Sequence, residues 1–183
     1  MTHLKRTLDE QKAEFKNRKL LATPIAGTLA WLIVGLGGMF LPPVGKVWVL
    51  FIATGSIVYL GMFISKFTGE NFLDRNRPPN TFDKLFFLTV SQALLVYSIA
   101  IPFFLVDYSS LPLTVGILTG LMWLPVSWII DHWVGVFHAV VRTALVLSLW
   151  FLLPEYRFIV IPFTIVGIYM VTIAILINRK TES

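Results

Sequence analysis

Residues 131–153 read DHWVGVFHAVVRTALVLSLWFLL, and this stretch decides the fold. Asp131 begins it, and the apolar run that follows carries a single charge, Arg142. A helix of about 20 apolar residues is long enough to cross the hydrocarbon core of a bilayer. A short turn at 154–156 and a second apolar run at 158–177 come next. The stretch therefore predicts a transmembrane helix that is joined to the next one by a tight turn.

The rest of the chain repeats this pattern of apolar runs and short polar links. The longest link, residues 66–84, contains two successive prolines, which exclude a continuous helix. Charged residues make up 14% of the chain, well below the roughly 25% of soluble domains. We predict an all-α, polytopic transmembrane bundle over residues 20–178, with an N-terminal helix over 1–19 and a tail over 179–183. The six predicted spans are 20–41, 47–65, 85–106, 111–130, 134–153 and 158–177.

The positive charges favour one orientation of these spans. With six spans, the side that holds both termini carries twelve Lys and Arg residues, and the opposite side carries two, Lys46 and Arg157. Cytoplasmic segments are enriched in Lys and Arg, so we expect both termini in the cytoplasm. Because the basic residues flank the predicted spans, topology explains the net charge of +5, and we expect no nucleic-acid partner. A five-span alternative would merge residues 111–153 into one span with a re-entrant piece.

The predicted N-terminal helix is polar. Thr7 followed by Glu10 fits a capping box, in which a hydroxyl and a carboxylate satisfy free amides at a helix start. Two interpretations of this helix stay open: a solvated segment that leads into the bundle, or an interfacial helix that binds anionic lipid headgroups. The lysines that would bind such headgroups are Lys5, Lys12, Lys16 and Lys19.

No sequence pattern indicates a catalytic centre or a metal site. The chain has no cysteine, which excludes disulfides, thiolate catalysis and Cys-ligated zinc. It contains no G-x-S-x-G, H-E-x-x-H or P-loop sequence. His132 and His138 are six residues apart, so they lie on different faces of a helix and supply too few ligands for zinc. We therefore expect no catalytic residue, metal or cofactor.

A polar stripe runs along the predicted span 134–153. At 100° per residue, Asp131, His138 and Arg142 lie on one helix face, where Gly135 leaves space. A charge at the centre of a membrane costs about 2.5–3.5 kcal/mol on insertion scales, so Arg142 is expected to face the protein interior and to have a partner. Asp131 lies about 16 Å from Arg142 along the helix axis, too far for an ion pair.

Three kinds of partner stay open for Arg142. The first is a main-chain carbonyl freed near Pro102, Pro125 or Pro162. The second is a polar side chain of a neighbouring span, namely Gln92, Tyr59, Tyr97 or Tyr169. The third is an anion from outside the chain, such as a lipid headgroup or a substrate. We predict a polar binding site with these members: Asp131, His138, Arg142, Gln92 and Tyr97.

Small and aromatic residues add weaker signals. Gly116 and Gly120 form a G-x-x-x-G spacing, which exposes backbone on one helix face and predicts close helix packing, within the chain or in a homo-oligomer. The six tryptophans fall mostly toward span ends, which is typical of anchors at a membrane interface. Trp123 and Trp128 flank the kink expected at Pro125, so lining a cavity is a secondary interpretation for these two.

Three functions are compatible with these patterns. The polar stripe favours a transporter or channel-like protein for a small anionic or polar solute, in which Arg142 attracts the solute, His138 relays a proton and Asp131 lies at the cytoplasmic mouth. A non-transporting accessory, assembly or lipid-interacting protein is the alternative. The third is a membrane enzyme that acts on a lipid-linked substrate. The overall pattern resembles small bacterial inner-membrane proteins with six spans, which implies a multi-pass protein in the lipid bilayer of the cell membrane and no particular activity.

Overall fold

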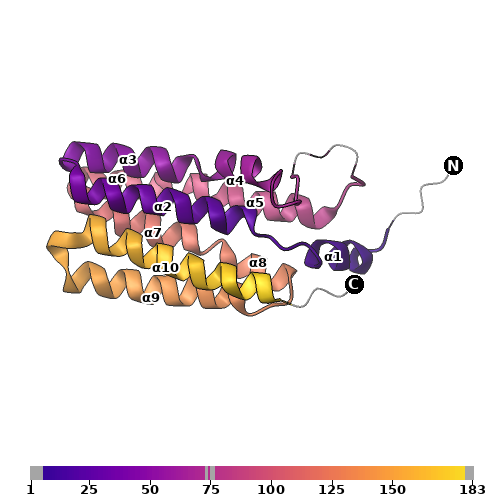
Figure 1. The fold of residues 1–183 in the computed structure, drawn as a ribbon. Helices are drawn as coiled ribbons and strands as arrows, with labels where there is room; N and C mark the ends of the chain where they lie inside the picture. Colours follow the sequence, from indigo (N-terminus) through magenta and orange to yellow (C-terminus); the bar gives the residue numbers. More distant parts are fainter. Residues whose placement is uncertain (1–5, 73, 75–76, 180–183) are drawn as a thin grey trace.

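Helices follow one another along the whole described chain (Figure 1). The computed structural model describes residues 6–72, 74 and 77–179, and within them it contains helices and no strand. The prediction of an all-α fold is therefore confirmed. The α-helices are α1 (Leu8–Lys16), α2 (Ala22–Phe40), α3 (Pro43–Gly55), α4 (Ile57–Ser65), α5 (Thr81–Leu95), α6 (Tyr97–Val106), α7 (Leu111–Gly120), α8 (Trp123–Ile129), α9 (Val134–Leu152) and α10 (Arg157–Asn178). The 3-10 helices η1 (Tyr108–Ser110) and η2 (Pro154–Tyr156) precede α7 and α10.

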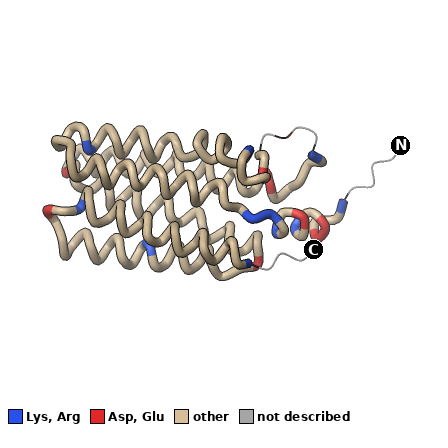
Figure 2. The backbone as a smooth tube through the Cα atoms, in the orientation of Figure 1, with Lys and Arg blue, Asp and Glu red and all other residues tan. Residues whose placement is uncertain are grey.

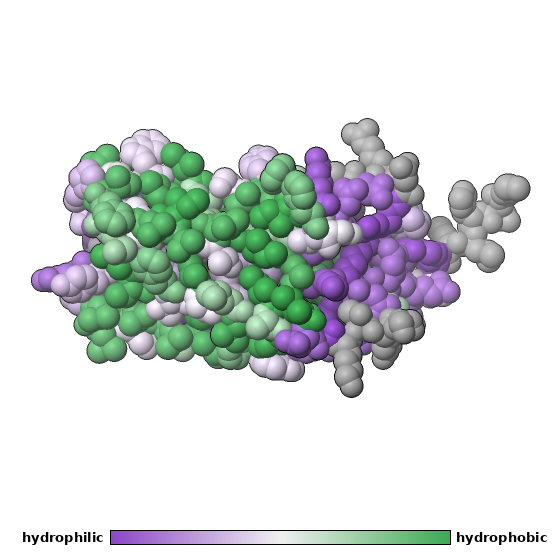
Figure 3. Space-filling view, in the orientation of Figure 1, coloured by the Kyte–Doolittle hydropathy of each residue, from purple (hydrophilic) through white to green (hydrophobic). Residues whose placement is uncertain are grey.

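Several helices, alone or joined end to end, are long and apolar enough to cross a membrane. Within the described residues five stretches have the required length and composition, and α3 with α4 makes a sixth if the pair, bent by 42°, is one span. The five are Ala22–Phe40, Thr81–Val106, Tyr108–Ile129, Val134–Leu152 and Pro154–Asn178. Figure 3 shows apolar surface over most of the bundle and polar surface at the end where α1 lies. The architecture is compatible with a location in a membrane.

Two helices begin earlier than predicted. α3 begins at Pro43 rather than at residue 47. Proline is favoured in the first turn of a helix because it has no N–H, and an N–H at that position would have no partner within the helix. α5 begins at Thr81 rather than at residue 85, because the Asn80 side chain caps it by accepting a hydrogen bond from the Phe82 N–H at 2.9 Å. The polar link predicted over 66–84 is correspondingly shorter.

Three of the apolar stretches are interrupted. Ser56 separates α3 from α4, and Val96 separates α5 from α6. Near the first break the Thr54 hydroxyl donates to a main-chain carbonyl one turn earlier at 2.6 Å, a type of bond that bends helices. The third break, between α7 and α8, lies at Leu121–Met122. Pro125 explains it, because a proline ring inside a helix clashes with the carbonyl four residues earlier.

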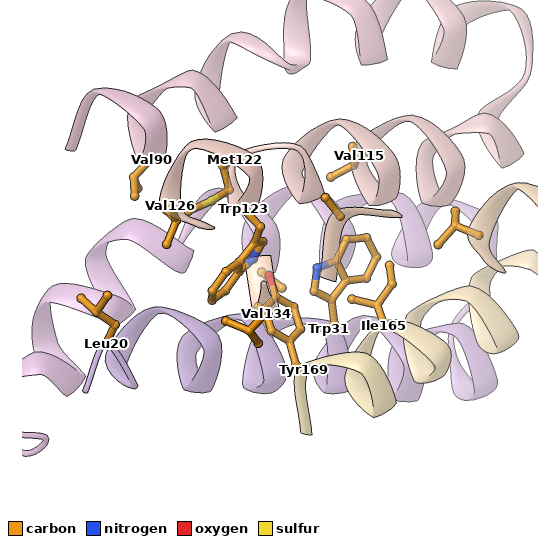
Figure 4. Close-up of a cluster of buried hydrophobic side chains, with 14 of the residues drawn as sticks. Leu20, Trp31, Val90, Val115, Met122, Trp123, Val126, Val134, Ile165 and Tyr169 are labelled. Atoms are coloured by element: carbon orange, nitrogen blue, oxygen red, sulfur yellow. The ribbon is translucent and has the colours of Figure 1, made fainter. Parts of the chain in front are cut away.

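The core lies where α2 and α10 run side by side (Figure 1). Gly27 of α2 faces the Tyr169 ring, and Gly38 faces the main-chain carbonyl of Phe158, so closely that a Cβ at either position would overlap its neighbour. Trp31 from α2 and Trp123 from α8 are buried in the same core (Figure 4). The bundle therefore places large aromatic side chains in its interior, next to backbone that glycine leaves bare.

α1 lies at the end of the bundle where the described chain begins and ends (Figure 1). The capping box predicted from Thr7 and Glu10 is confirmed. Figure 2 shows that Lys and Arg residues gather at this end. The N-terminal helix, predicted over 1–19, extends over Leu8–Lys16 in the structure. Residues 1–5 of that prediction and residues 180–183 of the predicted tail lie outside the described residues.

Polar bonds hold α1 to the bundle. Arg18 forms an ion pair with Asp83 of α5, and a second one with Glu14 at 3.0 Å. From the other end of the chain, the Arg179 guanidinium donates to the main-chain carbonyl of Lys16 at 2.8 Å and to that of Arg18 at 2.5 Å. Segments far apart in the sequence are therefore fastened together at this end.

Candidate functional site

Arg142 of α9 is fully buried, with 0% of its surface exposed. Its guanidinium donates from Nη2 to Thr119 Oγ1 at 2.9 Å and from Nη1 to Tyr169 Oη at 3.1 Å. Nη1 also lies 3.4 Å from Nε2 of His138, one turn earlier in α9. The guanidinium carbon is 5.3 Å from the centre of the Trp31 ring and 5.4 Å from that of the Tyr169 ring. We call this group, together with Trp123, the Arg142 cluster: Arg142, His138, Thr119, Tyr169, Trp31 and Trp123.

His138 is also fully buried, and its hydrogen bonds identify the tautomer of its neutral ring. Its Nδ1 lies 2.8 Å from the hydroxyl oxygen of Thr172, and that hydroxyl donates its own hydrogen to the Ile168 carbonyl at 2.8 Å. Nδ1 must therefore carry the hydrogen of the imidazole, which leaves a lone pair on Nε2 facing Arg142. The imidazole is held in place by stacking on Trp123, with ring centres 4.7 Å apart.

Every hydrogen bond that Arg142 donates ends on an atom of a neutral side chain. Among the described residues, Arg142 forms no ion pair with a carboxylate. Removing a charge from water is costly unless it is paired, so a guanidinium with neutral partners alone is an unusual arrangement. The positive charge of the cluster is therefore not balanced by the described part of the chain.

Three buried N–H groups of the cluster have no acceptor within the described chain: Nε of Arg142, Nε1 of Trp31 and Nε1 of Trp123. A buried donor without an acceptor costs about 1–3 kcal/mol, and most buried donors in proteins have one. Figure 4 shows the two indole nitrogens and the Tyr169 oxygen turned toward the same region of the core. Chemically, this arrangement suits a group that is rich in hydrogen-bond acceptors and negatively charged.

Glycine makes the room that Arg142 occupies. A Cβ on Gly120 of α7 would lie 2.8 Å from Cδ of Arg142, so a larger residue there would displace the arginine. One turn earlier, a Cβ on Gly116 would lie 3.3 Å from Cδ1 of Ile165, an apolar side chain of α10. The two glycines of the G-x-x-x-G spacing therefore lie against α9 and α10, and Gly120 also seats the buried charge.

A cavity of about 40 Å³ borders the cluster. Thr119 and Tyr169, the two hydroxyl partners of Arg142, line it on one side. Thr54 and Tyr97, whose hydroxyls lie 2.7 Å apart, line it on another. The remaining lining is mostly apolar and comes chiefly from α4 and α5: Ile57, Val58, Gly61, Met62, Phe86, Phe87, Val90, Ala93 and Leu94.

Asp131 does not join His138 and Arg142, contrary to the predicted stripe. α9 begins only at Val134, and Asp131 lies in the preceding turn with a φ of 48°, off the helical path. Its carboxylate accepts a hydrogen bond from Lys12 of α1 at 2.8 Å and lies 3.8 Å from the Lys16 ammonium. The bond from Lys12 lowers the pKa of Asp131 below its ordinary value. Asp131 thus fastens α1 to the bundle.

The other predicted binding residues also lie apart from Arg142. Gln92 is exposed on the outer face of α5, and Tyr97 pairs with Thr54 across the cavity. Of the side chains considered as partners of Arg142, Tyr169 is the one that binds it. Within the part of the chain that the structure describes, no group of three His, Asp or Glu side chains is gathered to hold a metal ion.

Sequence reasoning missed Thr119, Thr172 and Trp31 as members or supports of the cluster, and it gave Trp123 only a secondary role as a cavity-lining residue beside Pro125. The Trp31 and Trp123 side chains are buried in the core rather than anchored at an interface. For Trp31 one signal is present in the sequence, because it lies in the middle of its span and away from a span end. Threonines in apolar helices gave no signal, because they usually bond to their own helix.

Comparisons with known proteins place the chain in a family without assigning an activity. No curated protein and no solved structure matches it. The model of a family of unknown function, DUF7010, matches residues 8–179, which is nearly the whole chain and includes every member of the Arg142 cluster. The protein belongs to this family of unknown function, DUF7010.

Proposed function

We propose that this protein spans the membrane six times, with both termini in the cytoplasm, and that it binds and transports a small anionic or polar solute at the Arg142 cluster. The single observation that carries the binding site is a fully buried arginine that has neutral partners only and is surrounded by buried N–H donors. Preformed donors in a dry site are favourable for an anion, because no water competes for them.

The topology rests on length and charge. Our proposal counts the bent pair α3 and α4 as one span, in addition to the five other stretches. Lys and Arg residues gather at the end of the bundle where α1 lies, and far fewer lie at the other end (Figure 2). Because positive residues are retained on the cytoplasmic side, this end is the cytoplasmic one in our proposal. The bacterial inner membrane is the location that we propose.

The cluster supplies each contact that such a solute needs. Arg142 provides the charge, and Trp31 and Trp123 provide N–H donors that no residue of the described chain occupies. The hydroxyls of Thr119 and Tyr169 lie between Arg142 and the cavity, so a solute that arrives through the cavity replaces them on the guanidinium. The lone pair of His138 at Nε2 is available to accept a proton during this exchange.

Flux measurements test the proposal. Proteoliposomes that contain the wild type would be loaded with one of several small anions (chloride, nitrate, acetate or phosphate), and efflux would be followed by ion-selective electrode or radiolabel. We expect flux for at least one anion, abolished in Arg142→Gln, and unchanged in Gln92→Leu, which alters an exposed polar residue of a neighbouring helix. Equal flux in all three proteins would contradict the proposed role of Arg142.

A second function, binding without transport, is favoured by the closed surroundings of the cluster. Arg142 and His138 have no exposed surface. A lipid-interacting or accessory protein would bind an anion at the cluster and would not transport it across the membrane. Anion binding by detergent-purified protein, lost in Arg142→Gln, together with no flux above that of empty liposomes, would identify this second function.

A further inference from the structure

We propose that the solute held by the Arg142 cluster is a lipophilic monocarboxylic acid, which reaches the cluster from the hydrocarbon of the membrane between α4 and α5. This inference rests on the proposed function and names the substrate class. Its carboxylate would bind Arg142, and the first carbons of its alkyl chain would occupy the cavity that Thr119 and Tyr169 border, with the rest of the chain between α4 and α5 toward the lipid.

The lining of the cavity includes a residue that is exposed on the outer face of the bundle. Gly61 and Val58 from α4 face Ala93 and Leu94 from α5, and Leu94 is 49% exposed on the outer face of the bundle. In the proposed topology that face is in contact with lipid tails. A solute that follows this route passes between apolar side chains from the lipid to the cluster.

Aromatic rings close the cavity toward the end of the bundle where α1 lies. Phe72 is in contact with Phe86 and Phe87, with ring centres 5.7 and 5.8 Å apart. Phe15, which α1 inserts into the core with 1% of its surface exposed, packs on Phe86 at 5.8 Å. These phenylalanine side chains therefore separate the cavity from the polar end of the bundle, and we take the side between α4 and α5 as the entry route.

A weak acid suits a route of this kind because it can travel in its neutral form. The O–H proton of the carboxylic acid passes to the lone pair on Nε2 of His138, which gives up its contact with Arg142, and leaves a carboxylate beside Arg142. The imidazole becomes an imidazolium, the acid becomes an anion, and the total charge of the site is unchanged. The resulting carboxylate can accept bonds from Arg142 and from the indole N–H groups of Trp31 and Trp123.

The polarity of the lining distinguishes this class from a free inorganic anion. The hydroxyls of Thr54 and Tyr97 bond to each other, which leaves the middle of the cavity with apolar side chains. Phosphate or sulfate would have to cross this apolar space with two charges, whereas an alkyl chain gains by entering it.

Two radiolabelled acids test this inference: acetate, which has the headgroup alone, and octanoate, which adds an alkyl chain. Their equilibrium binding would be measured with wild-type protein in lipid nanodiscs, with protein-free discs subtracted. Gly61→Leu would fill the cavity, where a Cβ has room, its nearest neighbour being Ala26 Cβ at 3.9 Å. Gly167→Leu is the matched control, because Gly167 has no atom within 4 Å of its Cβ position.

We expect octanoate to bind at least tenfold more tightly than acetate. Gly61→Leu should weaken octanoate at least tenfold and leave acetate within about twofold, whereas Gly167→Leu should change neither. Ala93→Leu, which fills the same cavity from α5, serves as the second variant if Gly61→Leu does not fold.

The outcomes separate this inference from the function on which it rests. Acetate binding without any gain for octanoate, or an equal loss of both acids in Gly61→Leu, would overturn the lipophilic substrate and leave the anion site standing. If the wild type binds neither acid nor any inorganic anion, the proposed function fails, and the inference fails with it.

Discussion

Arg18 and Arg142 are both withdrawn from solvent, but the chain balances their charges in different ways. Arg18 forms ion pairs with Asp83 and Glu14, and these bonds raise its pKa although burial alone would lower it. Arg142 bonds to a threonine, a tyrosine and a histidine, none of which carries a negative charge. The charge of a cation that is surrounded by carboxylates is balanced within the protein. A cation with neutral partners alone is suited to bind an anion from outside.

The largest expected effect separates the two arginines by anion affinity. Arg142→Gln should weaken binding of the anion by about a hundredfold, because the charge and the charge-assisted bonds it makes are worth roughly 3 kcal/mol. Arg18→Gln, the matched change at the other arginine, should leave affinity within about twofold. Equilibrium binding to the purified proteins measures both values. Similar losses in the two variants would show that the effect comes from the fold rather than from the site.

The next effect separates them by stability. Arg18→Met should lower the free energy of unfolding by about 2 kcal/mol, because it leaves Asp83 partly buried without its ion-pair partner and removes one of the two ion pairs of Glu14. Arg142→Met should not lower it, since the substitution removes a buried charge that no carboxylate balances. Unfolding in a denaturing detergent, without added anion, compares them. A larger loss in Arg142→Met would mean that its neutral partners alone make it a stabilising structural residue.

A smaller effect is expected at the glycines of α7. Gly120→Ala should weaken anion binding about tenfold, because the added Cβ would lie 2.8 Å from Cδ of Arg142 and displace the guanidinium. Gly116→Ala, whose Cβ would lie 3.3 Å from the mobile end of Ile165, is the control and should change affinity by less than about twofold. An unchanged affinity in Gly120→Ala would indicate that Arg142 adapts without loss of function.

The smallest effect concerns Asp131, which fastens α1 from an exposed position. Asp131→Asn should lower stability at pH 7 by a few tenths of a kcal/mol, because half-exposed ion pairs are screened by solvent. The bond from Lys12 lowers the pKa of Asp131, so its contribution is present above the ordinary value of 3.8 and is lost as the pH falls through the lowered one. Melting curves of both proteins should therefore converge in strong acid. A constant difference down to that pH would contradict the ion pair.

The fold was largely predictable because length and hydropathy decide it. Apolar runs of about 20 residues and the prolines between them located the helices, and the errors at Pro43 and Thr81 came from capping residues. Arg142 and His138 were recognisable as members of the site, because ionisable residues in apolar helices are rare. Asp131 was misplaced because helical periodicity was extended through residues 131–133, where the chain turns.

The rest of the site depends on contacts between helices that are distant in the sequence. Thr119, Trp31 and Trp123 reach Arg142 or His138 from α7, α2 and α8, and no periodicity within one helix encodes which of these helices are neighbours. The indole N–H groups without acceptors are likewise a property of packing. Sequence therefore located the buried charge, and the structure located the donors around it.

Indole N–H resonances provide the most direct test of the anion site. Two-dimensional nitrogen–proton NMR spectra of the reconstituted protein would be recorded with and without saturating acetate or octanoate, and assigned by Trp→Phe substitution. The account predicts that the Trp31 and Trp123 signals move downfield as these N–H groups gain an acceptor, while those of the exposed Trp48, Trp128 and Trp133 stay in place. Unchanged Trp31 and Trp123 signals at an anion concentration that saturates binding would contradict it.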